Sequence, residues 1–445
     1  MILKRQHGLF VSTCFVVGFI VGTGIFFLPG RVLYEVGGST SLGTLAWIIG
    51  GLMISPIVLM FGVMAAKFEK IHGFVDYSEA LVGKKYGYLA GWFFAVMYQP
   101  AGYAIIAWIT SGFTATLVGV SGNDYLAFRF FVTAFFMVMT FMMNYFAPGL
   151  PVKFNVATTL ARLLPLVAMG TVGVIIGVFF TDTGEASATY EVLGGTSLFA
   201  AISATAFAFN GWQAALAFNS EVKDSKRKFP IALLGGFCVV ALVYVFYFVG
   251  IASALGEDVG IIMAGGGANF AEGTRIAFEN VFGAWAARFL IFFMIVSGLG
   301  ILNACCLGMG RAMYSLGRRE LGPVCNRTVL LDTDTNVPNN SMVMAVGISF
   351  LWYAVIYANT FVFQGFEFNL PDFYNFSFFA LLIPIFVCFA IKSKEFGFYK
   401  RFLLPSFAVS GAGFMFASYW IGNYTGAVVY LLVFVALAAV GMLLK

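Results

Sequence analysis

The sequence predicts an all-α polytopic membrane protein with 12 transmembrane helices. Only 10% of its 445 residues are Asp, Glu, Lys or Arg, whereas soluble domains carry about 25% charged residues. Apolar runs of about 20 residues, the length that a helix needs to cross a bilayer, recur along the whole chain. Lys and Arg are concentrated in alternate loops between these runs. These observations leave no room for a separate soluble domain.

The apolar runs give the expected order of the spans. They lie near 9–34, 42–66, 88–119, 126–146, 154–180, 197–219, 232–255, 285–317, 341–364, 372–391, 402–421 and 425–444. The eighth run is too long for a single crossing, so we expect it to extend into the cytoplasm.

Positive charge predicts the orientation of the spans. With 12 spans both termini lie on the same side, and only Arg31, Arg129, Arg275 and Arg288 then fall on the opposite side. Since Lys and Arg are enriched in cytoplasmic loops, both termini are predicted to be cytoplasmic, with residues 1–8 as a cytoplasmic N-terminus at the plasma membrane. The net charge of +5 therefore reflects topology, and no nucleic-acid partner is expected.

The cysteines and histidines predict neither a disulfide nor a metal site. Five of the six cysteines fall within predicted spans, and Cys325 falls in a cytoplasmic loop. His7 and His72 lie in separate cytoplasmic segments. An enzyme would need a cluster of His, Asp, Glu or Cys, so no enzyme activity and no cofactor are expected. The other competing class is a nutrient sensor derived from a transporter. Such a sensor usually carries a long cytoplasmic extension, which is not expected here.

The first span contains a predicted break. Gly22 and Gly24 flank Thr23 in mid-span, and Pro29 follows closely. Unpaired backbone groups are tolerated in a bilayer only where protein or a water-filled cavity surrounds them. Amides around Thr23, Gly24 and Ile25 suit a carboxylate, and carbonyls near Ile20 suit an ammonium group. The competing interpretation is that these glycines only allow close helix packing.

The sixth span contains a second predicted break. Asn210-Gly211 is a turn dipeptide in the middle of an apolar run, and carbonyls near Phe207 are expected to be free there. Breaks in spans one and six occupy corresponding places in two five-span units, residues 9–180 and 197–391. The sequence therefore predicts an inverted repeat with its site at the midplane. Residues 402–445 would add two peripheral helices and the C-terminus.

Three motifs, in order along the chain, carry a resemblance to a known family. Gly22–Phe26 is similar to a GxGIF motif in span one. Phe207–Trp212 is followed by Glu221–Pro230, which is similar to an ExKNPxRxxP loop although Asp224-Ser225 replaces Asn-Pro. Leu299–Asn303 is similar to the span-eight pattern. The chain thus resembles the amino acid–polyamine–organocation superfamily, close to bacterial amino acid permeases and the light chains of heteromeric amino acid transporters.

The resemblance implies a LeuT-like 5+5 inverted repeat that binds the amino acid backbone at the two breaks and works by alternating access. The expected substrate-binding residues are Ile20, Gly22, Thr23, Gly24, Ile25, Phe207, Ala208, Asn210, Gly211 and Cys305. Phe207 matches an aromatic gate, although among 53 phenylalanines it could also be one more core or lipid-facing residue. Asn210 either bonds the substrate or satisfies the broken backbone. Glu221 is expected to act as a cytoplasmic latch.

Arg162 is the notable charge within a predicted span. A buried ionisable residue in a membrane indicates a functional role, and many members of the resembled family carry Lys in this segment, where the cation stands in for sodium between spans one, five and eight. Arginine cannot release its proton in a protein, so Arg162 is predicted to be a fixed structural cation. The alternative is an arginine that reaches the cytoplasmic interface.

The predicted function is transport of amino acids by alternating access. No Asp or Glu lies near the middle of a span, and Cys305 lies among small residues, which favours neutral L-amino acids. The fixed charge predicted for Arg162 favours sodium-independent exchange. A proton- or sodium-coupled symporter and a cationic amino acid or polyamine antiporter remain open. The expected partners are the amino acid and membrane lipid, with a homo-oligomer left open.

Overall fold

The computed structural model describes residues 8–68, 73–147, 162–176, 197–216, 219, 222–265, 270–319, 325–330, 338–362 and 368–444. In these residues the regular structure is helical, and no β-strand is assigned among them. Nine of the described helices are long and apolar enough to cross a membrane, and one bent pair could form a tenth span. The prediction of an all-α polytopic membrane protein is therefore confirmed.

The count of 12 spans stays a prediction. The two remaining spans are the fifth and the sixth. The described part of the fifth is the helix Arg162–Ile176, and the sixth is divided into two short helices.

The crossing helices match the predicted apolar runs closely. They are α3 (Thr40–Phe68), the continuous segment α5 (Lys84–Trp92), η1 (Phe93–Tyr98) and α6 (Gln99–Val118), α7 (Asp124–Phe146), α11 (Ser225–Leu255), α14 (Ala284–Gly317), α16 (Asn339–Phe361), α17 (Leu370–Lys392), η5 (Tyr399–Leu403) with α18 (Leu404–Gly422), and α19 (Tyr424–Leu443). Shorter helices outside the spans are α4 (Phe74–Leu81), η3 (Gly256–Asp258), α12 (Val259–Gly265), α13 (Phe270–Phe282) and α15 (Cys325–Thr328).

Both predicted breaks are present. The first span consists of α1 (Leu9–Ile20) and α2 (Gly24–Glu35), whose axes differ by 53°. We call residues 21–23 the span-one break. The predicted sixth span contains two helices, α9 (Leu198–Ala208) and α10 (Trp212–Ala215). We call residues 209–211 the span-six break.

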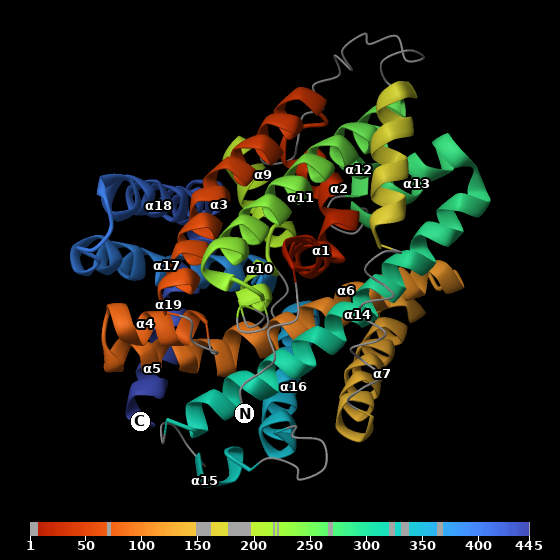
Figure 1. Cartoon of the computed structure of the whole chain (residues 1–445). Helices are drawn as coiled ribbons and strands as arrows, with labels where there is room; N and C mark the ends of the chain where they lie inside the picture. Colours follow the sequence, from red (N-terminus) through yellow and green to blue (C-terminus); the bar gives the residue numbers. More distant parts are fainter. Residues whose placement is uncertain are drawn as a thin grey trace.

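The broken spans lie inside the helix bundle. In Figure 1, α1 is seen end-on near the centre, beside α10 and α11 and above α6 and α14. The helix α11 packs against α3 and α1, α14 packs against α6, and α9 packs against α2, α3 and α18. The unwound backbone is thus surrounded by protein, as a break within a bilayer requires.

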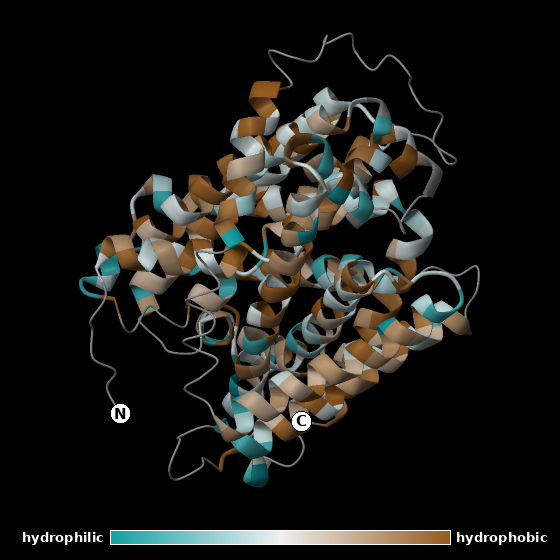
Figure 2. Ribbon diagram, turned by 90° about the vertical axis from the view of Figure 1, so that its right-hand side faces the viewer, coloured by the Kyte–Doolittle hydropathy of each residue, from teal (hydrophilic) through white to brown (hydrophobic). Residues whose placement is uncertain are grey.

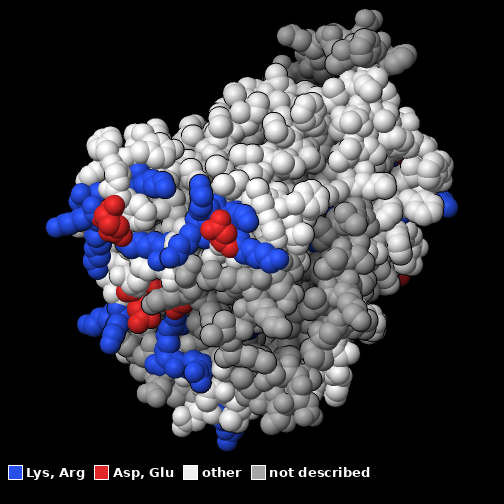
Figure 3. Space-filling view, in the orientation of Figure 1, with Lys and Arg blue, Asp and Glu red and all other residues white. Residues whose placement is uncertain are grey.

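Hydropathy and charge follow the expected pattern. Hydrophobic residues cover the sides of the long helices in Figure 2, and hydrophilic residues gather near helix ends and loops. On the face in Figure 3, Lys and Arg gather at the lower left, where Figure 1 places α4, α5, α15 and the C-terminal end of the chain. The Lys and Arg residues of this face are therefore concentrated in one part of it, in agreement with their uneven distribution along the sequence.

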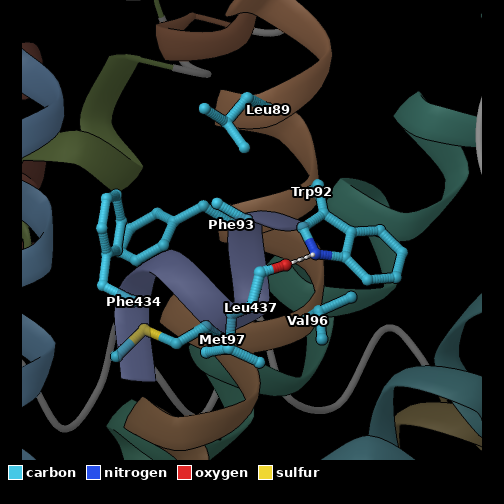
Figure 4. A pocket seen from close by; sticks show the side chains of 8 residues that line it. Leu89, Trp92, Phe93, Val96, Met97, Phe434 and Leu437 are labelled. Carbon is cyan, nitrogen blue, oxygen red and sulfur yellow. Dashed lines mark hydrogen bonds between the residues drawn. The ribbon is translucent and has the colours of Figure 1, made fainter. Parts of the chain in front are cut away.

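The last helix is fixed to span three. The Trp92 indole donates a hydrogen bond to the Leu437 carbonyl at 3.0 Å, and the Tyr88 hydroxyl donates to the Gly441 carbonyl at 2.7 Å. A small apolar pocket lies between these helices, with Phe93, Met97 and Leu437 in its wall (Figure 4). It offers few polar groups and none of the predicted site residues, so it is not the candidate site.

Candidate functional site

The two breaks lie directly against each other. A Cβ atom on Gly24 would lie 3.1 Å from the Phe207 ring and 3.3 Å from the Ala208 Cα. A Cβ atom on Gly211 would lie 2.1 Å from the Phe19 carbonyl oxygen, and Gly211 has a φ of +108°. Only glycine combines this backbone conformation with so close an approach. The glycines therefore bring the two broken backbones into contact.

The amide end of the span-one break is buried. The first turn of a helix leaves N–H groups without intrahelical partners, and here this turn belongs to α2, beginning at Gly24. Thr23, Gly24 and Ile25 are all buried. The Thr23 hydroxyl is buried with no hydrogen-bond partner among the described residues. Amide donors and a hydroxyl donor thus lie together, in an arrangement suited to a carboxylate.

The carbonyl end of α1 is more occupied than the sequence suggested. Ile20 and Gly22 are buried, and the Ile20 carbonyl, expected to be free, accepts a hydrogen bond of 3.2 Å from the Tyr244 hydroxyl. Tyr244 is fully buried against Trp47, with ring centroids 5.7 Å apart. A carbonyl oxygen has two lone pairs, so Ile20 retains acceptor capacity for a second donor.

Arg162 reaches the same helix end. Its Nη1 atom donates to the Gly18 and Val21 carbonyls at 3.4 and 3.3 Å, and the residue is 2% exposed. The guanidinium group therefore connects the helix Arg162–Ile176 to α1 inside the bundle. Span eight reaches the same break by another residue, because the Ile301 side chain lies 2.6 Å from the place of a Gly22 Cβ.

Aromatic rings form one wall beside the breaks. Phe207 is half-buried, and its ring lies 6.2 Å from the rings of both Phe27 and Tyr374, measured between centroids. Tyr374 stacks on Tyr98 with centroids 4.1 Å apart. Cys305, also half-buried, is one helical turn beyond Ile301 and lies near Tyr98 and Tyr374. Phe207 is therefore part of an aromatic cluster formed by four different spans.

Asn210 bonds one side chain of α17 and one of α10. Its amide nitrogen donates to the Asn375 side-chain oxygen, and its own oxygen accepts from Gln213 at 3.1 Å. Both contacts of the Asn210 side chain are with other side chains, and the break backbone is bonded by Gln213, whose oxygen accepts from the Gly211 N–H at 2.8 Å.

Ion pairs connect helices at both ends of the bundle. Near the C-terminal end of α2, Arg31 makes a bidentate pair with Asp372 of α17 at 3.1 and 2.8 Å. At the other end, Arg319 pairs with Asp76 and, at 3.2 Å, with Glu79.

A further pair at that second end joins Lys67 to Glu395 at 2.6 Å. The hydrogen bond from Lys67 lowers the pKa of the Glu395 carboxyl. This pair is therefore present at neutral pH and is lost as the pH falls and Glu395 is protonated. The predicted latch Glu221 lies outside the described residues.

Comparison with known proteins identifies the family. The family model described as "Amino acid permease" matches residues 8–443. The chain belongs to the amino acid permease family. It is 25% identical over 325 residues to the serine/threonine exchanger SteT of Bacillus subtilis, covering 73% of this chain and 71% of that protein. Family and relatives are transporters, so the expectation that the chain is not an enzyme is confirmed.

Two mammalian relatives are also similar. The mouse large neutral amino acids transporter small subunit 2 is 26% identical over 250 residues, and the mouse Asc-type amino acid transporter 1 is 27% identical over 259 residues. Both matches cover 55% of this chain, and they cover 46% and 47% of the relatives. The matched region is thus about half the length of these relatives.

Several residues at the site were not found from the sequence. Tyr244, Tyr374 and Asn375 lie on helices that are unbroken there, within ordinary apolar runs, and Ile301 was marked only as part of the Leu299–Asn303 motif. Arg31 stood out only as an exception to the charge asymmetry. Nothing local in the sequence shows which residue such a side chain faces, because each partner is distant along the chain.

Proposed function

We propose that this protein is an amino acid exchanger whose substrate site lies between the two breaks. The observation that carries the proposal is the direct contact of Gly24 with Phe207 and Ala208. This contact places the amide end of α2 beside the carbonyl end of α9. The amides of Thr23, Gly24 and Ile25 bind the substrate carboxylate. Carbonyls at Ile20 and near Phe207 accept from its ammonium group.

Neutral side chains fit this site best. The surrounding groups are apolar or uncharged: Ile301, Tyr98, Tyr374, Phe207 and Cys305. The described charged side chains discussed above lie at the helix ends and not at the breaks, Arg162 excepted. The printed functions of the relatives, serine/threonine exchange and transport of large neutral amino acids, agree with this class.

Arg162 supports exchange without ion coupling. Its guanidinium group binds carbonyls of α1 where a coupling cation would otherwise be held, and it keeps its charge throughout the physiological pH range. A symporter that uses sodium or protons is the second candidate.

The remaining features of the proposal concern topology. We infer 12 spans in two inverted five-span repeats followed by two peripheral helices, with both termini in the cytoplasm and the chain in the plasma membrane. The ion pairs at both ends of the bundle support a state closed on both sides. Phe207 would act as the outer gate and Glu221 as a cytoplasmic latch when the molecule alternates between open states.

The test is a counterflow screen with purified protein in liposomes. Each amino acid is loaded in turn, and uptake of labelled alanine, leucine and arginine is measured without a sodium or proton gradient. We expect uptake of a neutral label only into liposomes that contain a neutral amino acid. Uptake that requires a sodium or pH gradient would favour the symporter, and exchange of arginine alone would overturn the substrate class.

A further inference from the structure

The first turns of α17 contact both broken spans. Asp372 pairs with Arg31 of α2, which belongs to the first span. Three residues later on the same helix, Asn375 accepts a hydrogen bond from Asn210 in the span-six break. One short segment of α17 is therefore tied to the second half of span one and to the unwound part of span six.

The tie to span six is a chain of amide hydrogen bonds. It begins at the backbone of the break, where the Gly211 N–H donates to the Gln213 side-chain oxygen at 2.8 Å. The Gln213 amide nitrogen donates to Asn210 at 3.1 Å, and Asn210 donates to Asn375. It ends at the backbone of α17, where Asn375 donates to the Pro371 carbonyl at 3.2 Å. Side chains thus join the backbone of the break to the backbone of α17.

This chain of bonds is sensitive to the conformation of the break. Asn375 is fully buried, and buried amides that lose a partner cost more than exposed ones. Asn210 and Gln213 lie on either side of Gly211, whose left-handed backbone sets the direction between them. A change of this backbone would move Asn210 away from Asn375. The Asn210–Asn375 bond is therefore compatible with only a narrow range of break geometries.

We propose that Asn210 and Asn375 are positioning residues that make α17 follow the span-six break. With the break in the observed conformation, the amide pair holds α17 against the site, and Tyr374 then contacts Phe207. When the break rearranges, α17 is released at the end where Arg31 and Asp372 lie. The inference rests on the proposed function for its role in transport, but the structural tie can be tested without it.

The transport test is a double-mutant cycle in proteoliposomes with labelled alanine. Asn210→Ala and Asn375→Ala should each raise KM about threefold to tenfold from the side where Arg31 and Asp372 lie, and less than twofold from the other side. The KM of the double variant should not exceed that of the single variant with the higher KM, because all three variants lose the Asn210–Asn375 bond. Multiplicative effects, or equal effects from both sides, would overturn the proposal.

The structural test is hydrogen–deuterium exchange of the purified protein without substrate. Asn375→Ala should speed amide exchange severalfold in peptides that cover the span-six break. The matched control is Asn144, which donates to Asn303 at 2.9 Å and joins the unbroken α7 and α14. Asn144→Ala removes the same kind of buried pair and should leave the break peptides unchanged. Unchanged exchange in Asn375→Ala, or equal acceleration in both variants, would refute the tie.

The two tests separate the two proposals. If the wild-type protein exchanges no amino acid, the proposed function fails, and the deuterium experiment alone decides whether α17 follows the break.

Discussion

At the scale of single residues, Gly211 sets the geometry of the site. Its φ of +108° is strained for any residue with a side chain, and the Phe19 carbonyl lies where its Cβ would be. Gly235, in the middle of α11, has a helical backbone and no atom within 4 Å of the place of a Cβ. Glycine is therefore required at position 211 and is not required at position 235.

We predict that Gly211→Ala separates the two broken backbones and abolishes exchange. Backbone strain and the clash with Phe19 should together cost at least about 2 kcal/mol, measured as a lower melting temperature of the purified protein. Gly235→Ala, the control, should retain activity and stability, since alanine favours helix more than glycine. Activity in Gly211→Ala equal to that in Gly235→Ala would contradict the geometry described above.

Arg162 gives a second residue-scale prediction. Because its charge does not titrate near neutrality, exchange should vary less than about twofold between pH 6 and pH 8. Arg162→Lys keeps a cation that can lose its proton and should make the exchange rate depend on pH. Arg162→Ala leaves two carbonyls of α1 without this donor and should remove most activity. The measurement is the initial exchange rate across pH, and full activity in Arg162→Ala would refute a fixed cation.

Individual residues of the candidate site could be predicted only where the residue type is unusual for the surrounding sequence. Two glycines around Thr23, an Asn-Gly pair in an apolar run and Arg162 within the fifth predicted span are each unusual among their neighbours, so they could be recognised from the sequence. Tyr244 is an ordinary residue of an apolar helix, and the Leu299–Asn303 motif does not show what Ile301 contacts. Their contacts with Ile20 and Gly22 depend on which helix faces are brought together, and a local pattern does not contain that information.

At the scale of helices, α17 is the element that connects the two broken spans. The sequence predicted this helix well, from 372–391 against the observed Leu370–Lys392. Its role was not visible, because Asp372 pairs with an arginine 341 positions earlier in the chain. Apolar length and charge define a span, whereas its neighbours are set by the packing of the whole bundle.

The Arg31–Asp372 pair should stabilise the state closed at its end of the molecule. Both side chains are 14% exposed and the pair is bidentate, so removing one charge leaves the other poorly solvated. Asp372→Asn should slow exchange about tenfold or more. The double charge swap Arg31→Asp with Asp372→Arg should recover part of the loss in the same exchange assay. A swap no better than Asp372→Asn would argue against the pair as a closing contact.

At the scale of the whole molecule, ion pairs lie at opposite ends of the bundle, with the proposed site between them. Arg31 and Asp372 lie at one end, and Arg319 with Asp76 and Lys67 with Glu395 lie at the other. An exchanger must not open both ends at once, and paired contacts of this kind keep one end closed while the other changes. The positive-inside asymmetry predicts that the Arg319 end faces the cytoplasm.

The topology can be tested by labelling introduced cysteines in intact cells. A cysteine introduced at Tyr424, the exposed first residue of α19, should react with a membrane-impermeant thiol reagent from outside. One introduced at Phe398, exposed between α17 and α18, should react only after the cells are permeabilised. The reverse pattern would invert the orientation, and reaction of both from outside would contradict the span count in this region.

The central claim is that the paired breaks bind the carboxylate and ammonium groups common to all amino acids. The most direct test is competition in the exchange assay between alanine and two analogues, alaninamide and N-acetylalanine. We predict that alanine inhibits uptake of its labelled form, whereas each analogue inhibits at least about tenfold more weakly, because each leaves buried donors or acceptors unpaired. Inhibition by alaninamide as strong as that by alanine would show that the amide end of α2 does not bind the carboxylate.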